Sequence, residues 1–262
     1  MSAVAGTDVF DGLDVARAPA DGPVAFGGGL GPDVLLAAYR CGLFPMPAAD
    51  DYASAFNEAR FEEAAAAGEV ALLPGPDQAD DDPYALAWWS PDPRPVIEPA
   101  GVRLGSRFAR RLRNGLPWWT SADQAFDRVV AACAEGREPR WLSGELRAAL
   151  AILHQRGAAH SAEVWDGEEL IGGVFGVGVG PVLSLDSMFH RRPDAARVAV
   201  ADLAARFTAA DGRLLDAQWD TPHVRTLGAT LLPRARYLAV LAGPAATGPI
   251  PVEPLPAARL AG

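Results

Sequence analysis

The sequence predicts a mixed α/β fold of the α+β type, in which helices flank an open mixed sheet. Three observations support this prediction. The stretch His160–Phe189 indicates three consecutive strands, the first two joined at Asp166-Gly167, a dipeptide typical of tight hairpin turns. Residues 193–211 carry apolar side chains at helical spacing. A short apolar strand, Leu214–Gln218, follows that helix, so the order is strands, helix, strand.

Composition limits the class of protein. The chain has 262 residues, half of them hydrophobic, which is enough for one large or two modest domains with a substantial core. Its net charge of −10 and pI near 4.9 argue by themselves against a nonspecific nucleic-acid binder. The acids are concentrated, however, because residues 47–83 contain ten acids and one base. Every basic side chain in the chain is Arg.

Two isolated cysteines, Cys41 and Cys133, exclude a disulfide scaffold and a cysteine-rich zinc site. The N-terminus lacks the basic and then apolar pattern of a signal peptide. No apolar run reaches about 18 residues without Gly or a charge, as a membrane span would require. We therefore expect a cytoplasmic protein.

The N-terminal part of the chain predicts a flexible leader at residues 1–22 and a small domain at 23–100. Pro32 suits the first turn of a helix that Gly42 ends. The apolar segment Leu43–Met46 then continues in an extended conformation because Pro45 disfavours a helix before it.

Residues 47–86 change character and become Ala-rich and acidic. We interpret them as an inserted, partly helical, mobile loop whose charges are solvated. Trp88 and Trp89 follow, before a proline-rich turn at 90–94. Adjacent side chains of a strand point to opposite faces, so one of the two indoles could be free to stack on a ligand.

The larger domain is predicted at residues 101–242. Its further elements are expected helices at 103–114, 121–136, 144–157 and 221–227, a last strand at 236–241, and a disordered Pro/Ala-rich tail at 243–262.

Five Arg side chains within eleven residues distinguish the helix expected at 103–114. Arg103, Arg107 and Arg110 share one face, with Arg111 and Arg113 beside them. A solvated helix face is the ordinary explanation of such a run. In an acidic protein it is also consistent with a phosphate-binding patch.

Polar residues on apolar strands are the candidates for chemistry. Four glycines in residues 168–179 suggest either a ligand lying against the sheet or a bent, unoccupied strand. Asp186 lies among mostly apolar neighbours, where an unpaired carboxylate is costly. Period-two alternation places Asp216 and Gln218 on one face of the short strand at 214–218.

The predicted order of elements is similar to the acyl-CoA N-acetyltransferase fold, in which substrate enters a splayed central sheet. Six motifs in sequence order resemble the bacterial leucyl/phenylalanyl-tRNA–protein transferase family. They are GLFPM (42–46), WWSPDPR (88–94), HSAEVW (160–165), GGVFGV (172–177), DSMF (186–189) and LLDAQ…H…LGA (214–229). The family transfers Leu, Phe or Met from aminoacyl-tRNA to an N-terminal Arg or Lys of a protein and so marks that protein for degradation.

The resemblance implies roles for particular residues. Asp216 and Gln218 match the family's catalytic strand pair, and Asp186 stands where Glu is usual. Trp141 matches an aromatic that stacks on the terminal adenine, and Met46 replaces a second Trp there. The remaining assignments are an aminoacyl side-chain pocket at Val174, Leu203, Phe207 and Leu215, and tRNA-phosphate contacts at Arg103, Arg107, Arg110, Arg111 and Arg197, the last standing where Lys is usual.

The chemistry of such a transfer fits the residues present. An aminoacyl ester is already activated, so amide formation needs positioning, removal of a proton from the amine and stabilisation of an oxyanion, without metal or cofactor. Accordingly, the sequence has no GxSxG, HExxH or P-loop motif. The partners implied are aminoacyl-tRNA and acceptor proteins with N-terminal Arg or Lys, and we expect a monomer without membrane attachment.

Two alternatives remain from the sequence. An acetyl-CoA-dependent N-acetyltransferase requires a Gly-rich pyrophosphate turn before the helix at 193–211, and HRRPDAAR (190–197) lacks it. An inactive RNA- or peptide-binding relative would fit Asp at 186 and Met at 46, whereas Asp216 and Gln218 argue for an active enzyme.

Overall fold

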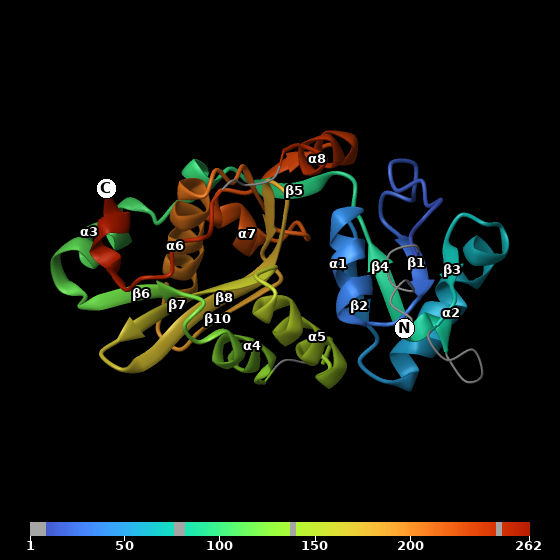
Figure 1. Cartoon of the computed structure of the whole chain (residues 1–262), viewed down its shortest axis with the longest axis horizontal. Coiled ribbons are helices and arrows are strands. Elements are labelled where there is room, and N and C mark those ends of the chain that lie inside the picture. Colours follow the sequence, from blue (N-terminus) through green and yellow to red (C-terminus); the bar gives the residue numbers. More distant parts are fainter. Residues whose placement is uncertain (1–8, 76–81, 137–139, 245–247) are drawn as a thin grey trace. The chain divides into compact units, whose positions relative to one another are not determined.

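The computed structural model describes residues 9–75, 82–136, 140–244 and 248–262, which fall into two units (Figure 1). Unit 1 comprises the chain up to Arg94 together with residues 136–153 and 232–241. Unit 2 comprises residues 95–135, 154–231 and 242–262. Within the described ranges, no helix has the length and apolarity needed to cross a bilayer.

Unit 1 contains a four-stranded sheet in the order β2-β4-β1-β3. Its strands are β1 (Pro23–Gly27), β2 (Phe44–Pro47), β3 (Ala71–Leu73) and β4 (Leu86–Trp89). β1 is buried along its whole length, pairing antiparallel with β4 and parallel with β3. The indole of Trp88 is buried and donates to the carbonyl of Gly27 at 2.8 Å, and Trp89 is half-buried.

The helices of unit 1 are α1 (Pro32–Arg40), α2 (Asp51–Ala66), η1 (Pro83–Ala85), α5 (Gly144–Gln155, in this unit up to residue 153) and α8 (Arg234–Leu241). The strand expected at 236–241 is wrong, because this segment belongs to α8. Tyr237 and Leu241 lie one helical turn apart and are both buried. The carboxylate of Asp92 accepts a hydrogen bond at 3.0 Å from the backbone N–H of Arg234, which opens the helix.

The acidic insertion is an integral part of unit 1 rather than a loop. Its helix α2 is anchored on one side by Asn57, which donates to the carbonyl of Tyr84 at 3.0 Å, and by Phe61, whose ring lies 5.7 Å from that of Phe26. Its strand β3 forms an edge of the sheet. The helical part of the prediction is confirmed, whereas residues 76–81, with several of the acids, lie outside the described residues.

The described part of the expected leader, residues 9–22, also packs against unit 1. The ring of Phe10 meets the buried indole of Trp88 edge to face, with 5.0 Å between centroids. The guanidinium of Arg234 donates to the carbonyls of Pro19 and Ala18. These long-range contacts order a segment whose composition suggested flexibility; residues 1–8 lie outside the described ranges.

Unit 2 contains a nine-stranded mixed sheet in the order β12-β5-β11-β9-β8-β7-β6-β13, with β10 also paired to β8. The α+β class with an open mixed sheet is thereby confirmed. The strands are β5 (Arg94–Ile97), β6 (Trp118–Ala122), β7 (Ala159–Asp166), β8 (Glu169–Val179), β9 (Val182–Ser184), β10 (Ser187–His190), β11 (Leu214–Asp216), β12 (Thr230–Leu232) and β13 (Leu255–Pro256).

Helices cover both faces of the β7–β8 part of this sheet (Figure 1). α4 (Phe126–Ala134) and α6 (Ala195–Ala209) pack on these two strands, and the other helices of the unit are η2 (Pro99–Gly101), α3 (Ser106–Gly115), α7 (Pro222–Leu227) and η3 (Ala257–Ala261). A Cβ on Gly172 would meet Ala195 of α6, and one on the next residue, Gly173, would meet Val129 of α4. The two helices therefore pack on opposite faces, as the alternation of a strand requires.

Two expectations for unit 2 are corrected. The helix expected from Ser121 begins at Phe126, because residues 118–122 form β6 and pair with β7. Where a disordered tail was expected, β13 pairs with β6, and Ala257 is fully buried. Residues 245–247 lie outside the described ranges.

Candidate active site

The sheet of unit 2 splays next to Asp186. β11 runs parallel to β9, with Asp216 opposite Ser184, and the next strand, β10, pairs with β8 instead. Gly178 pairs with Leu183, and Phe175 pairs with Ser187. Between these two pairs β8 moves by three residues, whereas the chain opposite moves by four. The extra residue makes a β-bulge, a feature that re-aims side chains next to active sites.

Backbone hydrogen bonds show how the chain turns at this bulge. The N–H of Leu185 still donates to the carbonyl of Asp216 at 2.8 Å, whereas the N–H of Asp186 donates to the carbonyl of Phe175 at 3.0 Å. A Cβ on Gly176 would run into the carbonyl oxygen of Ser184, so only glycine fits opposite the bulge. The hydroxyl of Ser184 also accepts the N–H of Val177 at 2.7 Å.

The glycines of β8 are thus explained by close packing within the protein. Gly172 accommodates α6, Gly173 accommodates Val129 and Phe189, and Gly176 accommodates the bulge. At Gly178 a Cβ would make ordinary contacts of 3.5 Å or more. The alternative of a bent strand without a ligand against it accounts for the first three positions.

The three predicted catalytic residues meet at the splay. The carboxylate of Asp216, 1% exposed, accepts the backbone N–H of Gln218 at 3.0 Å. The side-chain Nε2 of Gln218 donates to Oδ1 of Asp186 at 2.6 Å. Gln218 therefore links two carboxylates, one buried and one partly exposed.

The geometry of Gln218 differs from the sequence prediction. The strand ends at Asp216, and Gln218 adopts a left-handed conformation with φ of 61°. A non-glycine residue in this region carries backbone strain, which persists where the surrounding structure holds it and is typical of functional sites. The turn, rather than strand alternation, brings Gln218 beside Asp186.

The four residues assigned to the aminoacyl pocket lie in one apolar cluster. Val174, Leu203 and Leu215 are fully buried, and Phe207 is 3% exposed. Leu203 and Phe207 are one turn apart on α6, and Val174 and Leu215 come from β8 and β11. The structure therefore places all four together in the packed core.

The two residues assigned to the adenine site belong to unit 1. Met46 lies on β2, Trp141 precedes α5, and both are half-buried. Their near neighbours Pro47 and Ser143 line a cavity of about 770 Å³ within this unit. Its other lining includes the turn Gly27–Gly29, Leu72–Gly75 and the carboxylates of Asp82 and Glu145. Sequence reasoning identified the glycine turn but not the cavity.

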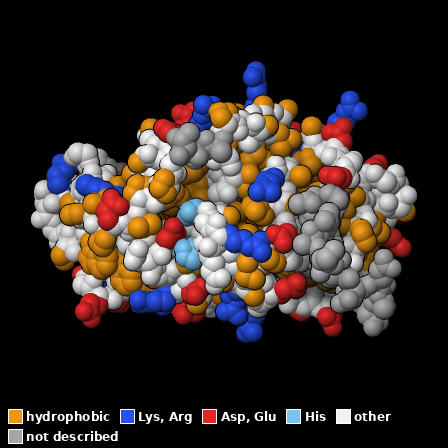
Figure 2. Space-filling model, in the orientation of Figure 1, with side chains coloured by type: hydrophobic (Ala, Val, Ile, Leu, Met, Phe, Trp, Pro, Cys, Tyr) orange, Lys and Arg blue, Asp and Glu red, His pale blue; other side chains and the backbone are white. Residues whose placement is uncertain are grey.

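The five arginines assigned to tRNA phosphates differ in their surroundings. Arg103, Arg107, Arg110 and Arg111 are all exposed around the start of α3, and on the face drawn in Figure 2 basic and acidic side chains are intermingled. Arg197 instead donates at 3.1 Å to the carbonyls of Arg103 and Thr226. A phosphate contact by Arg197 would require N–H groups of its guanidinium that do not donate to these two carbonyls.

One polar group near the splay, His223, was not assigned a role from the sequence. His223 at the start of α7 lies 3.3 Å from the sulfur of Met188, and burial, followed by the nearby Arg197 and His190, lowers the pKa of this imidazole. Met188 pairs with Val174 across β10 and β8. The position of His223 in the LLDAQ…H…LGA motif was the available signal.

A second unassigned polar group, Glu163, lies in the HSAEVW motif on β7. Glu163 is fully buried and accepts hydrogen bonds of 2.5 Å from the hydroxyls of Ser121 and Ser161. Burial raises the pKa of this carboxyl, although the two hydroxyls oppose the shift. Next to it, His160 contacts the carboxylate of Asp123 at 2.8 Å. Among the described residues, no three His, Cys, Asp or Glu side chains form a group that could hold a metal ion.

Comparisons of the sequence with known proteins match one family. The model of the leucyl/phenylalanyl-tRNA protein transferase matches residues 96–242, and that of its N-terminal domain matches residues 28–52. A leucyl/phenylalanyl-tRNA–protein transferase of Xanthomonas oryzae pv. oryzae is 37% identical over 87% of this chain and 80% of its own. One from Aromatoleum aromaticum is 38% identical over 95% and 92%. A solved Bacteroides thetaiotaomicron protein of unknown function shows 14% identity over 59% of this chain and 58% of its own, with a TM-score of 0.36.

Proposed function

The chain belongs to the leucyl/phenylalanyl-tRNA–protein transferase family, and we propose that it transfers Leu, Phe or Met from aminoacyl-tRNA to the N-terminal Arg or Lys of acceptor proteins at Asp186, Asp216 and Gln218. The observation that carries the assignment is the link that Gln218 makes between the two carboxylates at the splay. The reaction marks the acceptor for degradation, and we place it in the cytoplasm, where aminoacyl-tRNA is found.

The reaction itself requires little covalent chemistry from the protein. The acceptor's α-amine attacks the ester carbonyl carbon, a C–N bond forms, and the C–O bond to the tRNA ribose breaks. One proton leaves the amine and one is taken up by the departing ribose hydroxyl. Holding the two reactants in contact supplies much of the acceleration for such a step.

The two carboxylates suit the cationic acceptor. An N-terminal Arg or Lys brings a positively charged side chain and an amine that must lose a proton. Asp186 is partly exposed and already accepts one hydrogen bond at 2.6 Å, so a cation could share the same carboxylate. Asp216 is buried and holds the backbone of Gln218, and we assign it to orienting that residue.

Gln218 is the group that we place against the reacting atoms. Its Nε2 is committed to Asp186, which directs the side-chain oxygen of the same amide away from that carboxylate. A carbonyl oxygen in this position can accept a hydrogen bond from the attacking amine. The fixed amide also contributes a dipole that needs no reorganisation as charge develops.

The tRNA would be held by exposed guanidinium groups. Arg103, Arg107, Arg110 and Arg111 are exposed and can each meet a phosphate oxygen. The terminal adenine is assigned to Trp141 and Met46 beside the cavity of unit 1. The carboxylates of Asp82 and Glu145 in that cavity disfavour a phosphate there and leave room for a base.

A transfer assay tests the proposal. Labelled Leu on tRNA is incubated with the protein and with two acceptors that differ only in an N-terminal Arg or Glu. We expect labelling of the first acceptor and not of the second. Gln218→Leu, which keeps the shape and removes the amide, should lower transfer about 10²-fold, a loss typical of a positioned catalytic group. Equal labelling of both acceptors would contradict the assignment of Asp186 to the cationic acceptor.

A further inference from the structure

A buried ionic cluster lies on α6 beside the residues assigned to the aminoacyl pocket. Asp202 is fully buried and Arg206, one turn later on the same helix, is 2% exposed. Nε of Arg206 donates to Oδ2 of Asp202 at 2.7 Å. Leu203 and Phe207 follow these two residues by one position each, so they occupy the neighbouring face of the same turns of helix.

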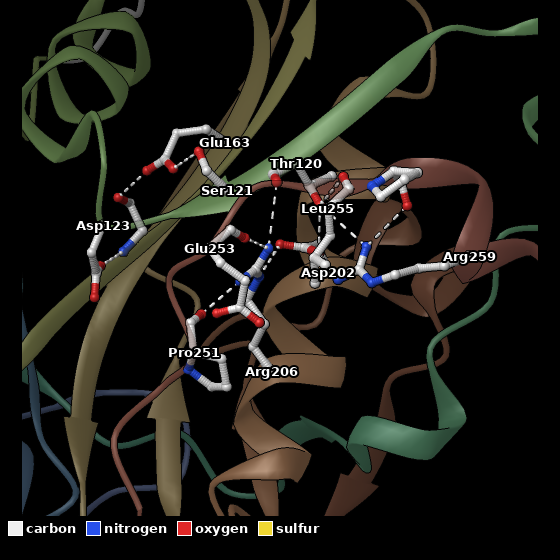
Figure 3. A network of polar contacts seen from close by, with 12 residues as sticks. Thr120, Ser121, Asp123, Glu163, Asp202, Arg206, Pro251, Glu253, Leu255 and Arg259 are labelled. Atoms are coloured by element: carbon white, nitrogen blue, oxygen red, sulfur yellow. Dashed lines mark hydrogen bonds and ion pairs between the residues drawn. The ribbon is translucent and has the colours of Figure 1, made fainter.

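The cluster ties α6 to the C-terminal segment of the chain (Figure 3). The guanidinium of Arg206 donates to the carbonyls of Pro251 at 2.6 Å and Glu253 at 2.9 Å. The guanidinium of Arg259, on η3, donates to Oδ1 of Asp202, and the figure shows both Arg side chains converging on this carboxylate.

The same cluster also holds the edge of the sheet. The hydroxyl of Thr120, on β6, donates to Asp202 at 2.7 Å and is itself approached by Arg259 at 3.2 Å. β13 pairs with β6 at Leu255 and Thr120. One carboxylate thus joins a helix, a strand and the C-terminal segment.

The C-terminal segment is packed as well as hydrogen-bonded. Ile250 and Ala257 are buried in the core cluster that contains the pocket residues, and Leu260 packs against it. Arg113 of α3 donates to the carbonyl of Ala261. Residues 243–262 nevertheless lie outside the matched family model, which ends at 242.

We propose that the C-terminal segment is a clasp that sets the position of α6 and thereby the choice of aminoacyl group, with Arg259 and Arg206 as positioning residues. The inference rests on the proposed function, because it takes Leu203 and Phe207 as pocket walls. A pocket of packed apolar side chains discriminates by shape, and a change of one methylene in such a pocket alters specificity by roughly 10- to 200-fold. A small displacement of α6 therefore changes which side chain fits.

Two readouts in the full-length protein test the clasp. Arg259→Ala removes the outer guanidinium, Arg259→Lys restores the charge without the fork, and Arg147→Ala on α5 is an exposed control. The first readout is hydrogen exchange of the amides of α6. The second is the ratio of kcat/KM for Leu-, Phe- and Met-charged tRNA with one acceptor.

We expect Arg259→Ala to speed exchange in α6 at least tenfold and to change the Leu-to-Phe ratio by about threefold or more, within the range for pocket changes. Arg259→Lys should recover part of both effects, KM for the acceptor should stay unchanged, and Arg147→Ala should alter neither readout.

Unchanged exchange in Arg259→Ala would overturn the clasp, whatever the transfer results. Faster exchange with an unaltered ratio would overturn its role in selection. If Arg259→Ala does not fold, Arg259→Lys decides by the same two criteria. Absence of transfer by the unaltered protein would overturn the proposed function, and with it the role in selection, while the exchange result would still decide whether the C-terminal segment holds α6.

Discussion

Two buried carboxylates in unit 2, Asp216 and Asp202, have opposite surroundings. Asp216 on β11 is 1% exposed and accepts the backbone N–H of Gln218, whose side chain reaches Asp186. Asp202 on α6 is fully buried and receives the guanidinium groups of Arg206 and Arg259. In the first network an amide side chain leads to a second, partly exposed carboxylate, whereas in the second two guanidinium groups meet at one carboxylate.

The difference distinguishes the candidate active site from the cluster that holds the C-terminal segment. A carboxylate bonded to two guanidinium groups is held by charge-assisted hydrogen bonds, which are about twice as strong as neutral ones. Removing one of the charged groups leaves the buried charge of its partner incompletely compensated. Asp186 accepts a hydrogen bond from the amide of Gln218 and is partly exposed, so an incoming cation can approach it.

The clasp should dominate stability. Arg206→Ala leaves a fully buried carboxylate with part of its compensation and is expected to lower the free energy of unfolding by about 3–5 kcal/mol. Arg225→Ala is the matched control, because Arg225 pairs with Asp220 at the surface, where ion pairs contribute little. Urea denaturation of both variants measures the effect. Equal losses in the two variants would remove the distinction between the clasp and a surface ion pair.

The site should dominate activity. Asp216→Ala is expected to lower transfer of Leu to an Arg-initiated acceptor about 10²-fold or more, because Gln218 loses the carboxylate that fixes its backbone. Its folding should be retained, which circular dichroism can check. Asp127→Ala, at an exposed position on α4, is the control. Near-normal turnover of Asp216→Ala would remove this carboxylate from the mechanism.

The pocket wall on α6 should shift selectivity. Leu203→Phe adds bulk to a fully buried position and is expected to favour Leu over Phe as the transferred group by roughly tenfold, within the range for one pocket contact. Unmodified protein should use Phe at least as well as Leu. Competition between Leu- and Phe-charged tRNA before and after the substitution measures the ratio. An unchanged ratio would mean that Leu203 does not line the pocket.

The exposed arginines at α3 should affect the salt dependence of tRNA binding. Replacing Arg103, Arg107 and Arg110 together by Ala should reduce the slope of log affinity against log salt by about 2–3, since each phosphate contact contributes roughly 0.7–0.9. An equal number of exposed arginines in unit 1, Arg17, Arg147 and Arg236, provides the control. If the slope of the first triple variant matches that of the control, α3 is a solvated face.

The smallest expected effect is a pH-dependent change in stability at Glu163, whose carboxyl is fully buried and accepts hydrogen bonds from two hydroxyl groups. Its pKa is raised by burial, so the folded state holds the proton more tightly than the unfolded state does. The associated stability is present below the ordinary glutamate pKa and is lost as pH rises through the raised one. Glu163→Gln should therefore gain stability relative to unaltered protein between about pH 4 and pH 7.

Thermal unfolding at several pH values measures this difference, with Glu168→Gln in the exposed hairpin as the control. A constant difference between Glu163→Gln and unaltered protein across that pH range would show that Glu163 does not titrate abnormally.

Local patterns explain which elements were predictable. The hairpin at 166–167, the strands on either side and helix α6 follow from turn chemistry and from period-two or helical spacing, which are written in neighbouring residues. The prediction for residues 236–241 was wrong because this short apolar run contains two β-formers, whereas Tyr237 and Leu241 are buried one helical turn apart. Short apolar segments do not distinguish the two states by themselves.

Distant partners explain what the sequence could not show. The residues after 243 have no apolar period, yet carbonyls in this segment are bound by Arg206, 45 and 47 positions earlier in the chain. Phe10 is ordered by Trp88 in the same way. Composition reports whether a segment can bury its own surface, and it contains no information about a partner that is distant in sequence.

The sequence by itself determined the α+β class, the family and the identity of the residues at the splay, because motif residues and strand periods are local properties. Tertiary structure alone decided how they meet. A one-residue bulge turns Asp186 away from β11, and a left-handed turn at Gln218 brings its amide within 2.6 Å of that carboxylate. The bulge depends on the register of β8 against β9 and β10, and the contact of Gln218 depends on that of β11 against β9, 32 residues earlier in the chain; register is fixed by packing across the whole sheet.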